Sequence, residues 1–123
     1  MPLQIQARGF ELTRSLERYV RERIRQGLDA RLDSSSRLQV GLSDINGPRG
    51  GPDKCCRVHI ALPQQRDVVV TETQPDMYAA IDRAIRRARQ VLARRRSKLL
   101  AQMQGRAKRA HRPLVMAVPG DNV

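Results

Sequence analysis

Aromatic residues and long apolar runs are both scarce in this sequence. Its 123 residues include no tryptophan, one phenylalanine and two tyrosines, so aliphatic side chains must fill the interior of a folded domain. No apolar run approaches the roughly 20 residues of a membrane-spanning helix. The first residues, MPLQIQARGF, also lack the apolar core of a secretory signal. We therefore expect a small cytoplasmic protein without a membrane partner.

Cysteine and histidine are scarce as well. Cys55 and Cys56 are adjacent, and neighbouring side chains on a strand point to opposite faces, so a disulfide between them would be strained. We interpret both as packing residues. With only His59 and His111 besides, no zinc site can be assembled, and no cofactor motif is present. A strand surface explains His59, and a helix cap explains Asp76, so we predict no catalytic residue, no metal site, no cofactor and no enzyme activity.

Acidic residues are few compared with basic ones. The chain carries 24 lysines and arginines against 12 aspartates and glutamates, which gives a formal net charge of +12. After Asp82, no acidic residue occurs before Asp121. A solvated helix face normally mixes both signs. The imbalance therefore indicates a phosphate-rich partner.

The longest amphipathic pattern lies between Gln74 and Leu100. Pro75 and Asp76 are typical of a helix start, and apolar residues then recur at steps of three and four, as on one buried helix face. These apolar residues are Tyr78, Ile81, Ile85, Ala88, Leu92 and Leu99. At about 100° per residue, four basic residues fall within roughly 60° of each other on one flank of that face. We interpret this flank as a polyanion-binding ridge; its residues are Arg83, Arg87, Arg94 and Lys98.

The rest of the chain predicts four strands and one further helix. Alternating apolar and polar residues indicate strands at about 3–8, 37–43, 56–62 and 66–72. Thr13 is a cap for an amphipathic helix over about residues 13–30. Two such helices need a common sheet face to bury their apolar stripes. The predicted fold is an α+β two-layer sandwich of order β-α-β-β-β-α, with a four-stranded sheet and two helices packed on one face.

The outer face of the first helix is open to two interpretations, a second basic face or an ordinary solvated surface. Its arginines recur at helical spacing, but Glu17 and Glu22 dilute their charge. These arginines are Arg14, Arg18, Arg21 and Arg25.

Composition separates a folded part from a tail. We expect one domain over residues 1–104 and a flexible tail over 105–123, where RAKRAHRP is basic and LVMAVPGDNV is mildly apolar without a period. The segment Asn46–Asp53, NGPRGGPD, is rich in glycine and proline. It lacks the GK[ST] ending and the following helix of a phosphate-binding P-loop. We interpret it as a flexible hairpin connection.

Two segments resemble the ribosome hibernation-promoting factors, a bacterial family also called ribosome-associated inhibitors or ribosomal subunit interface proteins. They are LTRSLERYV at 12–20 and DMYAAIDRAIRRARQVL at 76–92, and the resemblance covers about residues 3–100. It implies a protein that binds the small ribosomal subunit in the mRNA–tRNA channel, at the A and P sites, through rRNA phosphates. Such binding would inhibit translation and store ribosomes in stationary phase or stress.

The resemblance also implies partners. These are the small ribosomal subunit and its rRNA, whole ribosomes and, for some short forms, a separate ribosome modulation factor. The length of this chain is similar to that of the short forms, which either block single ribosomes or assist ribosome dimers; both behaviours stay open. Off the ribosome we expect a monomer.

The resemblance further implies which residues contact RNA. The family's basic positions correspond to Arg23 on the first helix and to four residues on the second. Position 90, where relatives usually carry a basic residue, is Gln90 with Arg89 beside it, and position 17 is Glu17. With Arg83 from the ridge, the predicted RNA-binding residues are Arg23, Arg83, Arg87, Arg89, Arg94, Arg96 and Lys98.

Two alternatives remain. The first is a generic double-stranded RNA-binding domain, although such domains carry lysines at the start of the final helix, where this chain has Asp76, Met77 and Tyr78. The second is a regulatory module that binds another protein. Salt distinguishes the protein module from an RNA binder, because binding through several phosphates weakens steeply as salt rises.

Overall fold

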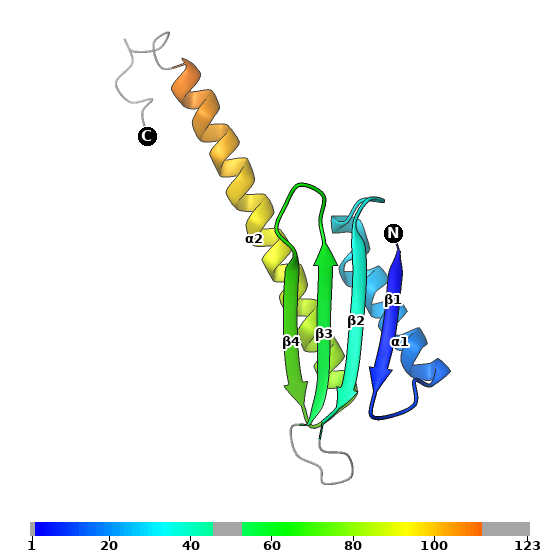
Figure 1. The fold of residues 1–123 in the computed structure, drawn as a ribbon. Helices are drawn as coiled ribbons and strands as arrows, with labels where there is room; N and C mark the ends of the chain where they lie inside the picture. The colour runs from blue at the N-terminus through cyan, green and yellow to red at the C-terminus, as the bar shows by residue number, and fades with distance from the viewer. Residues whose placement is uncertain (1, 46–52, 112–123) are drawn as a thin grey trace. The chain divides into compact units, whose positions relative to one another are not determined.

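The computed structural model of the chain describes residues 2–45 and 53–111 (Figure 1). Its elements follow the predicted order, with a short 3-10 helix after the first helix. The chain divides into two compact units, Met1–Leu92 and Ala93–Val123. The elements are β1 (Leu3–Arg8), α1 (Arg14–Gly27), η1 (Asp29–Arg31), β2 (Arg37–Asp44), β3 (Lys54–Ala61), β4 (Val68–Gln74) and α2 (Met77–His111).

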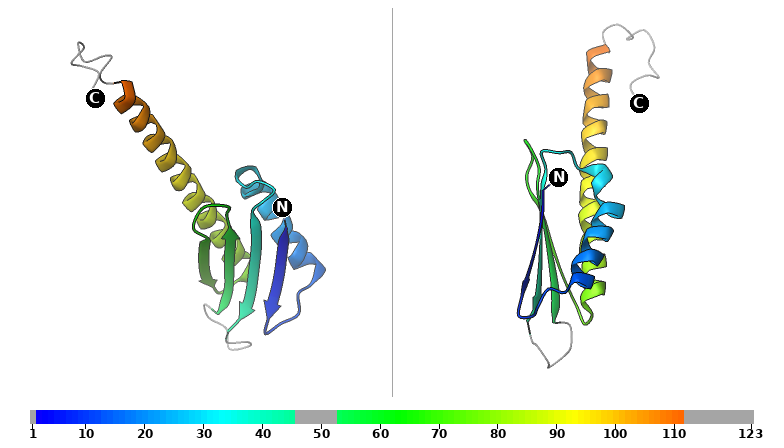
Figure 2. Two further views of the ribbon diagram at one scale, coloured as in Figure 1. Left: turned by 45° about the horizontal axis from the view of Figure 1, so that its top comes forward. Right: turned by 90° about the vertical axis from the view of Figure 1, so that its right-hand side faces the viewer.

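The four strands form one mixed sheet of order β1-β2-β3-β4. β1 runs parallel to β2, while the pairs β2–β3 and β3–β4 are antiparallel. A parallel pair needs a crossover, which α1 supplies, whereas the antiparallel pairs need only turns. α1 and residues 77–92 of α2 both lie on one face of the sheet (Figure 2). The predicted α+β two-layer sandwich is confirmed.

The core between sheet and helices is aliphatic. Val40, Val58 and Val70 form one row across three strands, and each side chain is buried. Ala84 and Ala88 of α2 are fully buried, and their small side chains let the helix lie close to the sheet. A chain almost without aromatic residues thus builds its interior from branched aliphatic side chains and alanine.

Both long helices begin at the residues that the sequence predicted. Thr13 caps α1, because its Oγ1 accepts a hydrogen bond from the Leu16 backbone N–H at 3.2 Å. At the start of α2, the backbone carbonyl of Asp76 accepts from the Ala80 N–H at 3.0 Å. The Asp76 carboxylate also accepts from the Tyr78 N–H at 3.4 Å. A helix cap therefore accounts for Asp76.

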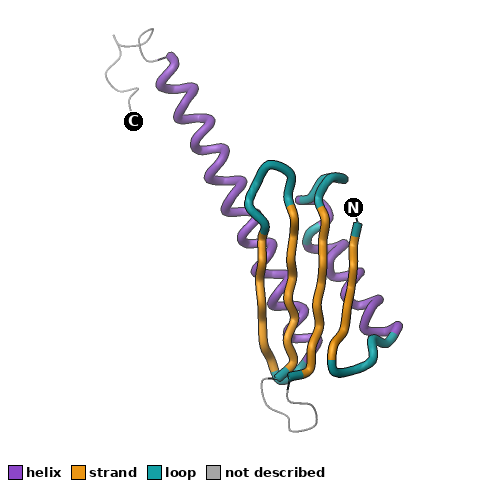
Figure 3. Tube along the Cα trace, viewed as in Figure 1, coloured by secondary structure: helices purple, strands orange, loops and turns teal. Residues whose placement is uncertain are grey.

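The second helix is longer than expected. α2 continues past Leu100 to His111, so the predicted domain boundary after residue 104 falls inside it (Figure 3). Leu99, which continues the apolar pattern, is 52% exposed, and the last buried residue of that pattern is Leu92. Of the predicted flexible segments, residues 46–52 of the hairpin connection and residues 112–123 of the tail lie outside the described residues.

The two cysteines lie on opposite faces of β3, as their adjacency predicts. Cys56 is fully buried in the core, Cys55 is partly exposed, and both are free thiols. Burial, with a smaller contribution from Cys55, raises the pKa of the Cys56 thiol to about 12. Over the described part of the chain, no helix is long and apolar enough to cross a membrane.

Candidate nucleic-acid interface

The outer face of α1 is partly neutralised by its own acids. Arg21 lies 3.2 Å from Glu17, and Arg25 lies 2.5 Å from Glu22, at i,i+4 and i,i+3 spacing. The pairing with Arg25 lowers the pKa of the Glu22 carboxyl, which favours its charged form. Arg14 and Arg18, the other two arginines of this face, are exposed and have no ion-pair partner among the described residues, so the face mixes paired and unpaired charges.

A basic groove lies between the two helices, inside the first unit. We call it the inter-helix groove; its volume is about 200 Å³. Three guanidinium groups and a single carboxylate line it, so the formal charge of the lining is about +2. Its lining residues are Arg23, Gln26, Gly27, Asp82, Ile85, Arg86 and Arg89.

Asp82 organises the α1 side of this groove. Its Oδ1 accepts a hydrogen bond from the Tyr19 hydroxyl at 2.7 Å and forms an ion pair with Arg23 Nε at 3.0 Å. Burial, and then the hydrogen bond to Asp82, raise the pKa of Tyr19. The Tyr19 ring packs edge-to-face on Tyr78, with ring centroids 4.7 Å apart. One carboxylate therefore joins α1 to α2 and holds Arg23 at the groove.

The remaining arginines of the groove are unpaired. Arg86 and Arg89 are both exposed, and neither has an ion-pair partner among the described residues. They lie i,i+3 on one side of α2, next to Asp82. Guanidinium groups bind phosphate oxygens in a planar, bidentate geometry. The groove can therefore take a phosphate without first breaking an ion pair of Arg86 or Arg89.

The predicted ridge on the other flank of α2 has a different composition. Arg87 Nη1 donates to the Thr71 backbone carbonyl at 3.1 Å and pairs with the Glu72 carboxylate, so this side chain fastens α2 to β4. Arg83 is exposed and has no ion-pair partner in the described part of the chain. Of the ridge residues in the first unit, only Arg83 keeps an uncompensated charge.

The last three predicted residues belong to the second unit. Arg94, Arg96 and Lys98 are exposed on the helical segment that follows Leu92. Leu99, Leu100 and Met103 are exposed on the same segment. The described part of this unit is therefore a helix with exposed basic and apolar side chains.

The structure brings two of the predicted residues together. Arg23 and Arg89 both line the inter-helix groove, while Arg83 and Arg87 lie on the other flank of α2. The sequence reasoning missed Arg86. Helical spacing could have found it, since Asp82, Arg86 and Arg89 recur at i, i+4 and i+7. Nothing in the sequence pattern indicated that Arg87 pairs with Glu72.

The groove presents groups that bind anions. It offers guanidinium and amide donors and one carboxylate that is already engaged by Tyr19 and Arg23. Among the described residues, no group of three or more His, Cys, Asp or Glu side chains could hold a metal ion. His59 lies on the opposite face of the sheet, where it contacts Asp67 at 2.7 Å.

Comparisons with known proteins give one family model and similar solved structures. A family model described as "Sigma 54 modulation protein / S30EA ribosomal protein" matches residues 3–100. The chain is similar to the N-terminal domain of Protein Y from Thermus thermophilus, with 28% identity and a TM-score of 0.63, over 76% of this chain and 98% of that one. It shares its fold with a ribosomal subunit interface protein from Coxiella burnetii, at 13% identity and a TM-score of 0.62, over 79% of this chain and 99% of that one. A comparison with curated protein sequences gives no significant match.

Proposed function

We propose a function from one premise: the chain belongs to the sigma 54 modulation protein / S30EA ribosomal protein family, whose model matches residues 3–100. The protein is a ribosome-binding factor. It occupies the small subunit in the channel for mRNA and tRNA, at the A and P sites, and so inhibits translation and preserves idle ribosomes in stationary phase or stress. Its contacts are made to rRNA phosphates, and it acts in the cytoplasm without catalysis.

The inter-helix groove is the observation that carries the RNA contact. Three arginines from two helices converge there against one carboxylate, and two of the three are unpaired within the described chain. A rigid sandwich that presents guanidinium groups to phosphates needs no base recognition to hold an RNA of defined shape. Arg94, Arg96 and Lys98 supply further phosphate contacts from the second unit.

Co-sedimentation tests this proposal. The purified protein is mixed with small subunits, large subunits and whole ribosomes, and pelleting is measured across a salt series. We expect pelleting with small subunits and whole ribosomes, absence from large subunits, and release as salt rises. Pelleting with any duplex RNA equally well would favour a generic double-stranded RNA-binding domain. Salt-resistant binding to a protein would favour the regulatory module.

A matched pair of variants locates the contact. Arg86→Ala/Arg89→Ala removes two positive charges from the inter-helix groove, and it should reduce the salt slope of binding by about one for each phosphate that the variant no longer binds. Arg21→Ala/Arg25→Ala removes the same charge from the outer face of α1, where both arginines are paired with glutamates. The groove variant should bind much more weakly than this control. Equal reductions would mean that net charge, and not the groove, determines binding.

A further inference from the structure

The face of the sheet that the helices leave uncovered is mainly polar, with Val69 as an exposed apolar residue on β4. Outward-pointing residues are aligned by the strand register into three rows that cross the sheet. The rows are Gln4–Gln39–His59–Val69, Gln6–Gly41–Arg57–Thr71 and Arg8–Ser43–Cys55–Thr73. No outward position in these rows is acidic.

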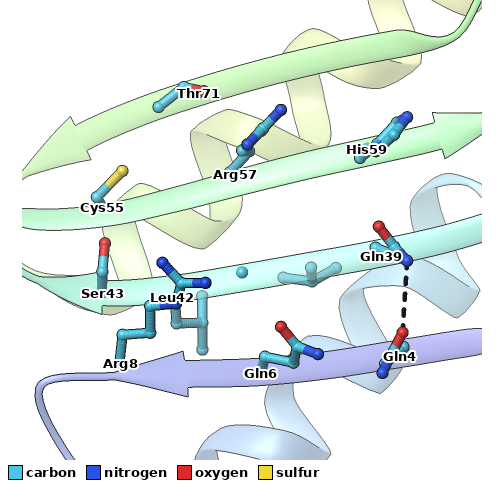
Figure 4. A pocket seen from close by; sticks show the side chains of 12 residues that line it. Gln4, Gln6, Arg8, Gln39, Leu42, Ser43, Cys55, Arg57, His59 and Thr71 are labelled. Atoms are coloured by element: carbon cyan, nitrogen blue, oxygen red, sulfur yellow. Dashed lines mark hydrogen bonds between the residues drawn. The ribbon is translucent and has the colours of Figure 1, made fainter.

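Gly41 lies at the centre of this face and leaves a hollow over β2. The hollow has a volume of about 310 Å³, and Figure 4 shows the side chains that surround it. A Cβ atom built on Gly41 would meet nothing within 4 Å, so the glycine is not needed for packing. The register runs through it without a bulge, from Gln6 across to Arg57. A glycine inside a strand often marks a bulge, a tight bend or a site where a ligand approaches the backbone closely, and the register shows no bulge here.

Two arginines flank the hollow. Arg57 projects from β3 and Arg8 from β1, and neither has an ion-pair partner among the described residues. At the far end of the hollow, His59 is paired with Asp67, and the Gln4 and Gln39 amides bond to each other at 3.4 Å (Figure 4).

Unlike Gln4 and Gln39, the Gln6 amide has no hydrogen-bond partner within the described chain. It lies beside Gly41, in the same row as Arg57. The side chains that stay available at the hollow thus include two guanidinium groups and one amide, beside the smaller polar groups of Ser43, Cys55 and Thr71.

We propose that this hollow binds one unpaired nucleotide of a single-stranded RNA. Its volume is at the lower end of the range for small-ligand pockets, about 300 Å³. A base can lie on the backbone at Gly41 with the Arg57 guanidinium plane against it, because bases in single-stranded RNA stack on arginine planes as well as on aromatic rings. The Gln6 amide, which both donates and accepts, faces the base edge. Arg8 binds the phosphate.

Other occupants match these groups less well. An acidic peptide could also use the guanidinium groups and the amide, but it has no flat ring to stack on the Arg57 guanidinium plane. A second copy of the chain would place like charges against each other. This inference goes beyond the proposed function, because it concerns the opposite face of the sheet from the inter-helix groove and an RNA strand without a duplex.

Gly41→Val is the most informative variant. Valine has a higher strand propensity than glycine and meets open space here, so the melting temperature should stay the same or rise. The added side chain fills the hollow, and affinity for a short single-stranded RNA oligonucleotide, measured by fluorescence anisotropy, should fall roughly tenfold or more. A stable variant with unchanged affinity would overturn the proposal. A marked drop in melting temperature would show that Gly41 has a structural role and would overturn it too.

Arg57→Ala provides the second test, with Arg37→Ala as its matched control. Arg37 is exposed on β2, on the same face of the sheet as Arg57, but it lies outside the hollow. Both variants therefore remove one positive charge from this face. Arg57→Ala should bind the oligonucleotide more weakly, while Arg37→Ala should bind it almost as well as the wild type. Equal reductions would indicate general attraction by charge and would overturn the nucleotide site.

The same assay distinguishes single-stranded RNA from other ligands, and binding at the hollow from binding at the inter-helix groove. Tighter binding of a free mononucleotide than of the oligonucleotide, or a dimer that Gly41→Val disrupts, would overturn the assignment to RNA. In the Arg86→Ala/Arg89→Ala background, Gly41→Val should still lower the affinity for the oligonucleotide, because those two arginines lie on the helix side of the sheet. One set of results would refute this inference and leave the proposed function intact. In it, Gly41→Val changes neither oligonucleotide affinity nor ribosome pelleting, while Arg86→Ala/Arg89→Ala abolishes ribosome pelleting.

Discussion

Replacing Asp82 by asparagine should weaken the fold slightly and strengthen RNA binding. Among the described residues, Asp82 is the only carboxylate that lines the inter-helix groove, and it engages both Tyr19 and Arg23. Asparagine keeps an oxygen that can accept the hydrogen bond from the Tyr19 hydroxyl, but it lacks the negative charge. The formal charge of the groove then rises from about +2 to about +3, and Arg23 is released from its ion pair.

The two effects have opposite signs and can be measured separately. The ion pair is partly solvated, with side-chain exposures of 41% and 32%, so its removal should cost about 1 kcal/mol at most. For a domain of this size, that corresponds to a melting temperature lower by about 4–8 °C. A phosphate about 6 Å from the Asp82 carboxylate would gain about 0.7 kcal/mol in a water-like dielectric when the negative charge is removed, which is roughly threefold in affinity.

Small-subunit binding at low salt is the assay, and Glu17→Gln is the control. Glu17 also pairs with an arginine, at 3.2 Å, but it lies on the outer face of α1, so this variant removes the same charge outside the groove. Asp82→Asn should bind more tightly than Glu17→Gln, and the difference should shrink as salt rises. Weaker binding of Asp82→Asn, or equal effects of the two variants, would refute the view that the groove holds a phosphate. The pKa of Tyr19 should also fall toward its ordinary value, which absorbance titration can follow.

Three further predictions concern the fold. Thr13→Ala removes the cap of α1 and should cost about 1 kcal/mol in urea unfolding, whereas Thr13→Ser should cost little. Arg87→Ala should reduce stability by about 1 kcal/mol or less, while it changes small-subunit binding less than Arg83→Ala does, because Arg87 is already paired with Glu72. The neutral Cys56 thiol is favoured in the folded state, with a pKa of about 12 against an ordinary value of 9.0, so its contribution to stability is complete below pH 9.0 and is lost as the pH rises toward about 12. Urea unfolding across this range should show a smaller decrease in stability for Cys56→Val than for the wild type.

The fold could be predicted from the sequence because its local signals agree with each other. Strand alternation, helical spacing and caps at Thr13 and Asp76 all indicated the same β-α-β-β-β-α order, and the structure has it. The end of α2 was harder to predict. Past Leu92 the side chains of Leu99 and Leu100 are about half exposed, so the helix continues without the burial that defines an amphipathic pattern. Periodicity alone could not indicate how far the helix continues past its last buried residue.

The candidate site could be predicted only in part. Helical spacing identified exposed arginines on α2, but exposure does not show which arginine has a partner. Arg86 and Arg87 are sequence neighbours on opposite flanks of the helix; Arg87 reaches Glu72 on β4, whereas Arg86 faces the groove beside α1. This difference depends on which strand and which helix lie next to α2, and that arrangement is set by the tertiary fold. The hollow at Gly41 was missed for the same reason, since it needs four strands in register.

The net charge of +12 therefore overstates how much of this protein can attract RNA, and the distribution of acids decides where attraction remains. Three glutamates each form an ion pair with an arginine: Glu17, Glu22 and Glu72. In the groove, Asp82 pairs with Arg23, and Arg86 and Arg89 stay unpaired among the described residues. An unpaired guanidinium can bind a phosphate without first separating from a carboxylate, so it contributes more to affinity than a paired one of equal exposure. By this criterion we expect RNA to bind in the groove between the helices, where Arg86 and Arg89 are unpaired, and on the open face of the sheet, where Arg8 and Arg57 are unpaired among the described residues.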